Sequence, residues 1–123
     1  MPKFYLCEAC KNIAGLVTER AGTLSCCNTP MKYLEPGVVE ASREKHLPEV
    51  TKTASGLTVK VGSVPHPMED AHYIDFVYVQ TENGGQIAKL SPGQNPEVSF
   101  VLNEDAKAVY EYCNLHGLWK TEV

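Results

Sequence analysis

The residues of this chain that can bind a metal fall into two sets. All four histidines and all five cysteines lie in short motifs suited to ligation. The first set has only sulfur donors and consists of Cys7, Cys10, Cys26 and Cys27. The second set is rich in nitrogen and consists of His46, His66, His72, Cys113 and His116. This pattern predicts two metal centres, one with four thiolates and one with imidazoles and a single thiolate.

The sulfur set has a Cys-x2-Cys motif, then fifteen residues, then the adjacent pair Cys26 and Cys27. Four cysteines in such spacing most often hold structural zinc, with iron as the second choice. Adjacent residues project to opposite sides of an extended backbone, so this pair can bind one ion only where the chain is kinked. We therefore expect a strained tetrahedral site. Taken alone, these residues favour a structural zinc site that has no catalytic role.

The nitrogen-rich set lies in stiff, turn-rich segments. His66 stands between two prolines and His46 precedes Pro48 by two positions, so both loops are restricted near the imidazole. Cys113 and His116 have the spacing at which two side chains of one turn reach a common ion. Five donors are too many for ordinary tetrahedral zinc and favour a metal with five or six positions. With neutral imidazoles and one thiolate, a divalent ion keeps a charge of about +1 and could attract a small anion.

Residues 1–36 should form a small domain held together by its metal. They offer few large aliphatic side chains, namely Leu6, Ile13, Leu16, Val17 and Leu24. A unit of fewer than about 40 residues usually needs a metal or disulfides to stay folded. The turn signal Glu35-Pro36-Gly37 ends this segment.

Residues 37–123 should form a β-sandwich, so the chain as a whole is predicted to be mainly β. Residues 38–49 carry mixed charge and suggest a connector with one helical turn. From residue 50 onward the pattern is β: Leu57, Val59 and Val61 alternate with polar residues, and Asn83-Gly84 is a hairpin signal. Strands are predicted at 57–61, 72–80, 86–90, 97–102, 108–113 and 118–123. Short strands between frequent turns are typical of a sandwich.

Composition excludes several classes of function. The net charge of −4 and pI near 5.5 leave no basic stripe for nucleic acid. No apolar run reaches 18 residues, so no membrane span is expected. Five cysteines do not suit a pure disulfide framework, and the N-terminus has no secretory signal pattern. A reducing, cytoplasmic location follows as the expectation.

Four separated motifs resemble those of superoxide reductases. They are Glu44-Lys45-His46-x-Pro48, Gly62-Ser63-Val64-Pro65-His66-Pro67-Met68, His72-Tyr73-Ile74 and Tyr112-Cys113-Asn114-Leu115-His116-Gly117-x-Trp119-Lys120. With the four N-terminal cysteines, the chain is similar over its whole length to desulfoferrodoxin, the two-iron class of that family.

The resemblance implies two iron ions per chain. A desulforedoxin-like domain, residues 1–36, would hold a distorted iron–tetracysteine centre. An immunoglobulin-like β-sandwich, residues 37–123, would hold a ferrous ion with His46, His66, His72 and His116 as equatorial ligands, Cys113 as axial ligand and the sixth position open. The implied activity is the one-electron reduction of superoxide to hydrogen peroxide, with two protons taken up and no dioxygen produced.

The resemblance also assigns roles to Lys45 and Glu44. The lysine would attract superoxide and help deliver protons, and the glutamate would bind the ferric ion after turnover. A unit charge about 6 Å from an anion is worth roughly 3 kcal/mol at an effective dielectric near 20, before salt screening. The usual electron donor of similar proteins is rubredoxin, and similar proteins are commonly homodimers.

The sequence also allows two other functions. One is a rubredoxin-like electron carrier in which the sandwich is only a scaffold. The other is a zinc-stapled interaction module. The metal content separates them, because the reductase needs two irons, the carrier needs one and the module contains only zinc.

Overall fold

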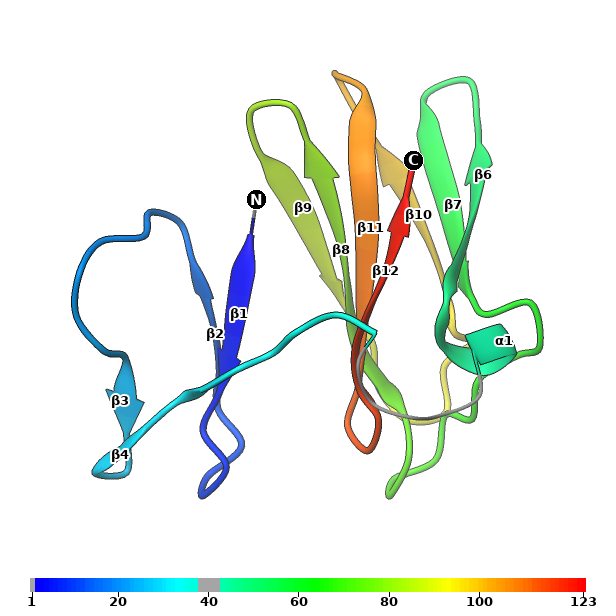
Figure 1. Ribbon diagram of the computed structural model, residues 1–123. Helices are drawn as coiled ribbons and strands as arrows, with labels where there is room; N and C mark the ends of the chain where they lie inside the picture. The colour runs from blue at the N-terminus through cyan, green and yellow to red at the C-terminus, as the bar shows by residue number, and fades with distance from the viewer. Residues whose placement is uncertain (1, 38–42) are drawn as a thin grey trace. The chain divides into compact units, whose positions relative to one another are not determined.

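The computed structural model describes residues 2–37 and 43–123, without the side chains of Arg43 and Glu44. The chain divides into two compact units, Met1–Glu35 and Pro36–Val123, and each has its own sheets (Figure 1). No helix among the described residues is long and apolar enough to cross a membrane.

The first unit contains five short strands. They are β1 (Lys3–Leu6), β2 (Ile13–Leu16), β3 (Ser25–Cys26), β4 (Thr29–Pro30) and β5 (Lys32–Tyr33). The order β2-β1-β5 makes one sheet, and β3 and β4 form a separate hairpin. Its buried apolar side chains are Phe4, Cys7 and Leu34, whereas Val17 is fully exposed. This core is too small to hold the unit by itself, as the sequence predicts for a metal-stapled domain.

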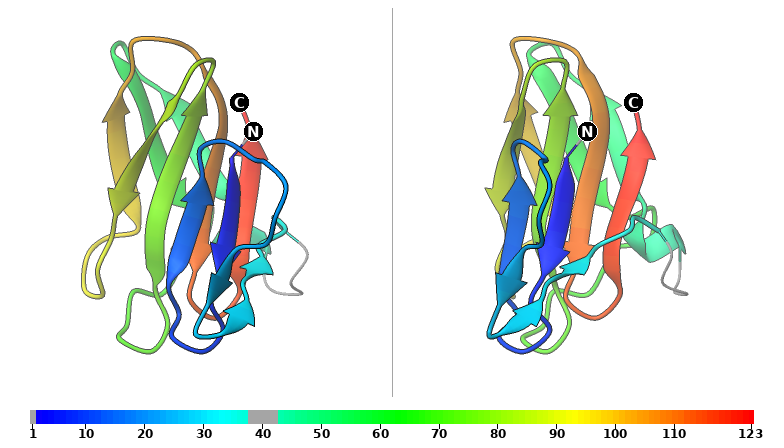
Figure 2. Two further views of the ribbon diagram at one scale, coloured as in Figure 1. Left: turned by 90° about the vertical axis from the view of Figure 1, so that its left-hand side faces the viewer. Right: turned by 60° about the vertical axis from the view of Figure 1, so that its left-hand side comes forward.

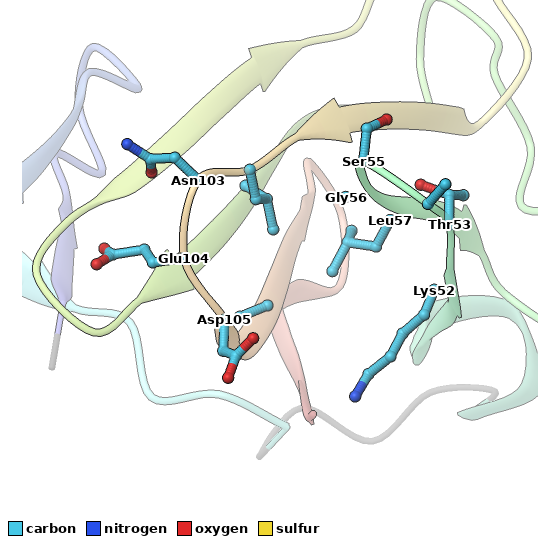
Figure 3. Close-up of a pocket in the computed structure, with 11 residues that line it drawn as sticks. Lys52, Thr53, Ser55, Gly56, Leu57, Asn103, Glu104 and Asp105 are labelled. Atoms are coloured by element: carbon cyan, nitrogen blue, oxygen red, sulfur yellow. The ribbon is translucent and has the colours of Figure 1, made fainter.

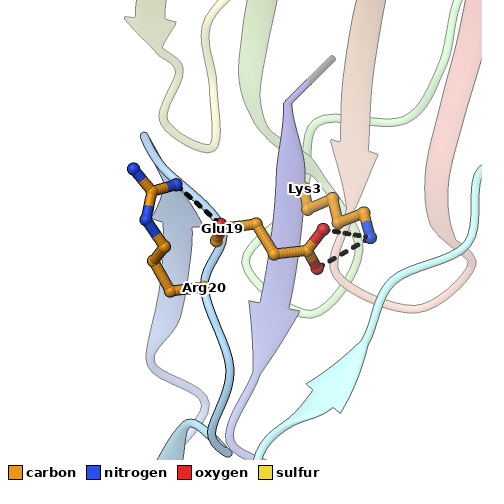
Figure 4. Close-up of polar contacts among 3 residues, drawn as sticks. All are labelled: Lys3, Glu19 and Arg20. Carbon is orange, nitrogen blue, oxygen red and sulfur yellow. Dashed lines mark hydrogen bonds and ion pairs between the residues drawn. The ribbon is translucent and has the colours of Figure 1, made fainter.

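An ion pair ties the start of β1 to the loop after β2. Lys3 Nζ lies 2.9 and 2.8 Å from the two carboxylate oxygens of Glu19, and Arg20 Nη1 donates to the Glu19 carbonyl (Figure 4). The carboxylate raises the pKa of Lys3. Both side chains are partly exposed, so solvent screens their attraction. The pair therefore orders the loop but contributes little to the stability of the unit.

The second unit is a sandwich of seven strands preceded by one helical turn. That turn is α1 (Arg43–His46), and the strands are β6 (Pro48–Lys52), β7 (Gly56–Val61), β8 (Ile74–Thr81), β9 (Gly85–Lys89), β10 (Glu97–Val101), β11 (Ala106–Cys113) and β12 (Gly117–Glu122). Every strand predicted from the sequence is present with bounds shifted by at most two residues.

One strand extends into the predicted connector. β6 begins at Pro48 and pairs antiparallel with β7, with Pro48 opposite Val61. Three of its five residues are exposed, so its own sequence carries little apolar alternation. Pairing with the regular strand β7, whose Leu57, Val59 and Val61 are buried, gives this segment its strand conformation.

The two sheets of the sandwich have the orders β10-β7-β6 and β12-β11-β8-β9. The chain changes sheet between β7 and β8, between β9 and β10, and between β10 and β11 (Figure 2). The core between the sheets is dominated by β-branched residues that include Val59, Val77, Val79 and Val109. Cys113, at the end of β11, belongs to the same core.

The two ends of the sandwich differ in chemistry. At the lower end in Figure 1 lie α1, the segment between β7 and β8, and the β11–β12 turn, which together carry all the histidines. At the other end a pocket of ≈ 320 Å³ lies between the β6–β7 turn and the β10–β11 loop, beside Lys52, Asn103, Glu104 and Asp105 (Figure 3). Among the described residues that line this pocket, none is a histidine or cysteine.

The sandwich core generates a stability prediction. Val59 on β7 is fully buried, whereas Val101 on the neighbouring strand β10 is 73% exposed. Val59→Ala should lower the free energy of unfolding of the sandwich by about 2 kcal/mol, through lost apolar burial and a residual cavity. The matched control Val101→Ala should change it by less than about 0.5 kcal/mol. Denaturant unfolding followed by the fluorescence of Trp119, the single tryptophan, measures both. Equal losses would contradict the burial argument.

Candidate metal centres

A tight turn allows the adjacent residues Cys26 and Cys27 to face the same side. Cys26 ends β3, its partner across the hairpin is Thr29, and Cys27 and Asn28 form the two-residue loop between them. Both loop residues have positive φ, 52° for Cys27 and 59° for Asn28. A hairpin loop of this kind matches the twist of its strands, although it places a non-glycine residue in the left-handed region. The kink expected from the sequence is therefore present, and it turns Cys27 toward the same side as Cys26.

The first cysteine pair sits in a second turn, between β1 and β2. The Cys10 N–H lies 3.5 Å from the Cys7 sulfur, and the Lys11 N–H donates to the Cys7 carbonyl at 2.8 Å. Lys11 adopts a φ of 70°, which closes the turn. The two cysteine turns face each other, and the four sulfurs lie within 4.8 Å of one another.

Two of the sulfur separations are close to those around a tetrahedral ion. The Cys10 and Cys26 sulfurs are 3.6 Å apart, and those of Cys26 and Cys27 are 4.0 Å apart. Metal–sulfur bonds of about 2.3 Å in a tetrahedron require sulfurs about 3.8 Å apart. The observed values bracket that spacing.

The acid–base properties of the free thiols show why this cluster needs a cation. The pKa of Cys7 is lowered to about 6, first by the Cys10 backbone N–H. The pKa of Cys27 is raised to about 12 by its sulfur neighbours, with Cys10 the largest contributor. Four thiolates at this spacing repel one another unless a positive ion lies between them.

The second centre gathers side chains from three places in the sandwich. His46 ends α1, His66 and His72 lie in the segment between β7 and β8, and Cys113 and His116 border the β11–β12 turn. The pairing of Cys113 with Ile74 brings the β8 and β11 ends together. The positive φ of Gly117 (84°) permits the tight turn that brings His116 back toward Cys113.

The four imidazole rings form a closed cycle. His46 contacts His66, His66 contacts His72, His72 contacts His116, and His116 contacts His46, with centroids 4.7, 4.7, 5.1 and 4.9 Å apart. Each pair meets edge to face, with interplanar angles from 74° to 84°. Such a cycle brings four imidazoles close enough together to share one metal ion.

The two nitrogen separations measured from His46 fit neighbouring ligands of one metal ion. His46 Nε2 lies 3.1 Å from His66 Nε2 and 3.2 Å from His116 Nδ1. Metal–nitrogen bonds of about 2.1 Å at right angles require neighbouring nitrogens about 3.0 Å apart. The donor atoms of His46, His72, Cys113 and His116 all lie within 4.8 Å of one another. The Cys113 sulfur is 3.9 Å from His116 Nδ1.

Neighbouring groups orient two of the rings and hold the backbone of a third histidine. The His66 Nδ1 faces the Pro67 carbonyl at 2.7 Å and so donates its proton there, which leaves Nε2 as a lone-pair donor. His46 stacks on Trp119 with centroids 5.0 Å apart, and the Trp119 Nε1–H donates to the His116 carbonyl. Neither contact of Trp119 could be predicted from the sequence, because neither has a spacing signature.

Burial favours the neutral form of His66 and His72, the form that binds a metal. Desolvation lowers the pKa of His66 to about 4 and also lowers that of His72, to which the neighbouring His116 contributes second. The buried Nε2 atom of His72 has no hydrogen-bond partner among the described residues. A buried polar atom without a partner is costly, and a metal ion in the cycle would satisfy it.

Cys113 and Glu111 lie deeper, on β11. Burial raises the pKa of the Cys113 thiol, against the opposing effect of the Leu115 and His116 backbone N–H groups. Glu111 is fully buried, neither of its oxygens has a partner among the described residues, and desolvation raises its pKa well above the ordinary value. A neutral acid two residues before the thiolate donor was not identified from the sequence, where it has no motif of its own.

The remaining predicted site residues lie on α1. Lys45 is partly exposed, and its charge is one of the influences that lower the pKa of His72. The side chain of Glu44 lies outside the part of the chain that the structure describes.

Two family models match the chain. The desulfoferrodoxin model covers residues 38–122, and the model of the desulfoferrodoxin N-terminal domain covers residues 2–34. Desulfoferrodoxin of Syntrophotalea carbinolica is 46% identical over 118 residues, covering 96% of this chain and 94% of that protein. Desulfoferrodoxin of Nitratidesulfovibrio vulgaris is 41% identical over 120 residues, covering 98% and 95%.

One solved structure agrees over nearly the whole chain and another over about two thirds of it. The superoxide reductase of Treponema pallidum superimposes with a TM-score of 0.84 at 32% identity, covering 99% of both chains. The one-iron superoxide reductase of Giardia intestinalis has a TM-score of 0.57 at 28% identity, covering 65% of this chain and 97% of that one. The tetracysteine and histidine–cysteine groups match the two iron sites of desulfoferrodoxin. The chain therefore belongs to the desulfoferrodoxin family.

Proposed function

We propose that this chain is a superoxide reductase, an oxidoreductase that reduces superoxide by one electron to hydrogen peroxide without producing dioxygen. The observation that carries the proposal is the closed cycle of four imidazoles beside the buried Cys113 thiol. Such a reductase must deliver one electron and two protons to superoxide. It therefore needs a redox-active ion with an open coordination position and a nearby cation.

In this proposal His46, His66, His72, His116 and Cys113 would hold the catalytic iron ion. That ion would supply the electron, and the Cys113 thiolate would raise its electron density. The four rings form a closed cycle, and Cys113 lies in the sandwich core. Five protein donors would leave a six-coordinate ion one position for a small anion.

Lys45 attracts the substrate and delivers protons. It directly precedes the ligand His46, and its charge influences His72, so the ammonium group lies within electrostatic reach of the centre. None of the ion pairs among the described residues includes Lys45. On a chain with a net charge of −4, a local cation is needed to draw in an anion.

Glu44 is assigned its role by its place in the sequence, next to Lys45. A carboxylate on the same short helix as His46 would provide an oxygen ligand for the oxidised ion at the position that the substrate leaves.

The electron donor, the assembly and the location complete the proposal. We propose a rubredoxin or a similar small redox protein as donor, a homodimer, and the cytoplasm as the compartment. The last is supported by five cysteines that are all free, since both centres require thiolates and a reducing compartment maintains them.

Metal analysis and anaerobic pulse radiolysis test the activity together. Two irons per chain and a fast bimolecular reaction of the reduced protein with superoxide are expected. One iron at the cysteines alone would instead indicate an electron carrier, and zinc alone an interaction module. A two-iron protein that does not react with superoxide would overturn the proposal.

Lys45→Ala should slow the reaction with superoxide by about tenfold and flatten its dependence on ionic strength, because the steering charge is lost. Lys52→Ala is the matched control, since Lys52 is exposed at the opposite end of the sandwich. Rate constants from pulse radiolysis at several salt concentrations measure both. Identical salt dependence in Lys45→Ala and the unmodified protein would refute steering.

Cys113→Ser should abolish the thiolate-to-iron charge-transfer absorption of the oxidised histidine centre, because a hydroxyl has no comparable sulfur orbitals. The visible bands of the tetracysteine centre should persist and serve as an internal reference. The absorption spectrum of the oxidised variant provides the measurement. Survival of the charge-transfer band would show that Cys113 is not the axial ligand.

A further inference from the structure

We propose that Asn114 is a positioning residue that holds His72 in register with Cys113 and His116. The inference rests on the proposed ligand set for the histidine centre and goes beyond it, since Asn114 itself is no ligand. It stands in the β11–β12 turn, directly after Cys113, and its side chain reaches the loop that carries His72.

Three hydrogen bonds join Asn114 to the residues on either side of His72. The Tyr73 N–H donates to the Asn114 Oδ1 at 2.9 Å, and the Asn114 Nδ2 donates to the Ala71 carbonyl at 3.0 Å. The Asn114 backbone N–H donates to the Tyr73 carbonyl at 3.2 Å. The partners settle the orientation of the amide, because a backbone N–H can only donate and a carbonyl can only accept.

The side-chain amide of Asn114 adds two hydrogen bonds to the backbone bond between Asn114 and Tyr73. β8 and β11 pair up to Ile74 and Cys113, where the register shifts by a bulge. Beyond that point the Asn114 side chain takes the place of a peptide group, since it offers one acceptor and one donor in fixed geometry. An aspartate offers only acceptors when ionised, and a leucine offers neither.

His72 depends on the hydrogen bonds of Asn114 more than the other three histidines do, because each of those has a neighbour of its own. His66 is fixed by the Pro67 carbonyl, and Trp119 supports both His46 and His116. Among the described residues, the buried Nε2 of His72 has no hydrogen-bond partner. The His72 backbone forms an isolated bridge to Glu69, with bonds of 2.9 and 3.1 Å. Its position therefore follows from its backbone, which Glu69 holds on one side and Asn114 on the other.

The experiment compares three variants of the full-length, iron-loaded protein. Asn114→Ala removes both side-chain hydrogen bonds. Asn114→Asp has nearly the same size and keeps the acceptor for Tyr73, but it cannot donate to Ala71. Asn103→Ala is the matched control, because Asn103 is exposed in the β10–β11 loop at the other end of the strand.

The readout is the iron retained by the histidine centre against a competing chelator, followed by its charge-transfer band. The tetracysteine absorption is the internal reference. Orienting groups around metal ligands typically contribute 10- to 100-fold in affinity. We expect a loss in that range for Asn114→Ala, a several-fold loss with a displaced band for Asn114→Asp, and no change for Asn103→Ala.

Unchanged affinity and band position in Asn114→Asp would overturn the inference, because a residue that only fills space tolerates that substitution. If Asn114→Ala does not fold, Asn114→Asp decides alone. Superoxide reactivity of the unmodified protein is measured in parallel. If the unmodified protein does not react with superoxide but Asn114→Asp loses iron affinity, the proposed activity is rejected and the role of Asn114 stands. If the unmodified protein reacts with superoxide and Asn114→Asp keeps its iron affinity and band position, only the role of Asn114 is rejected.

Discussion

The pairing of β11 with β8 is the constraint on which the histidine centre depends. It places Cys113 opposite Ile74, so that the loop ending at Tyr73 and the turn beginning at Asn114 leave the sheet at the same end. β11 is held between β8 and β12, and most of its residues are buried. A shift of one residue in this register would move Cys113 from the core to the other face of the sheet. The metal therefore meets a site whose sulfur donor the sheet has already placed.

Much of this arrangement can be predicted from the sequence because it is carried by local patterns. Alternation in Leu57, Val59 and Val61 predicts β7, and the Asn83-Gly84 signal predicts the β8–β9 turn. The two donor sets are visible as cysteine and histidine motifs. The predicted sandwich with a small cysteine-bearing N-terminal part is confirmed. The structure also brings together four cysteines in one group and His46, His72, Cys113 and His116 in another.

What the sequence does not contain are the contacts made between distant segments. β6 depends on β7 for its conformation, so its first residues, Pro48 and Glu49, suggest only a connector. The stacking of Trp119 on His46 joins β12 to α1, and the amide of Asn114 acts on residues about forty positions earlier. Glu111 is a further case, since a carboxylic acid in a strand is ordinarily expected on the exposed face. Each of these depends on register, which no short motif records.

The low pKa of His66 has a consequence for the conditions under which the centre stays assembled. A proton competes with a metal for an imidazole nitrogen only below the pKa of that ring, which burial lowers from 6.5 to about 4 for His66. At pH 5.5 an ordinary exposed histidine is mostly protonated, whereas the His66 nitrogen keeps its lone pair for a metal. Burial of this ring therefore removes proton competition at one of the five proposed donors in mildly acidic solution.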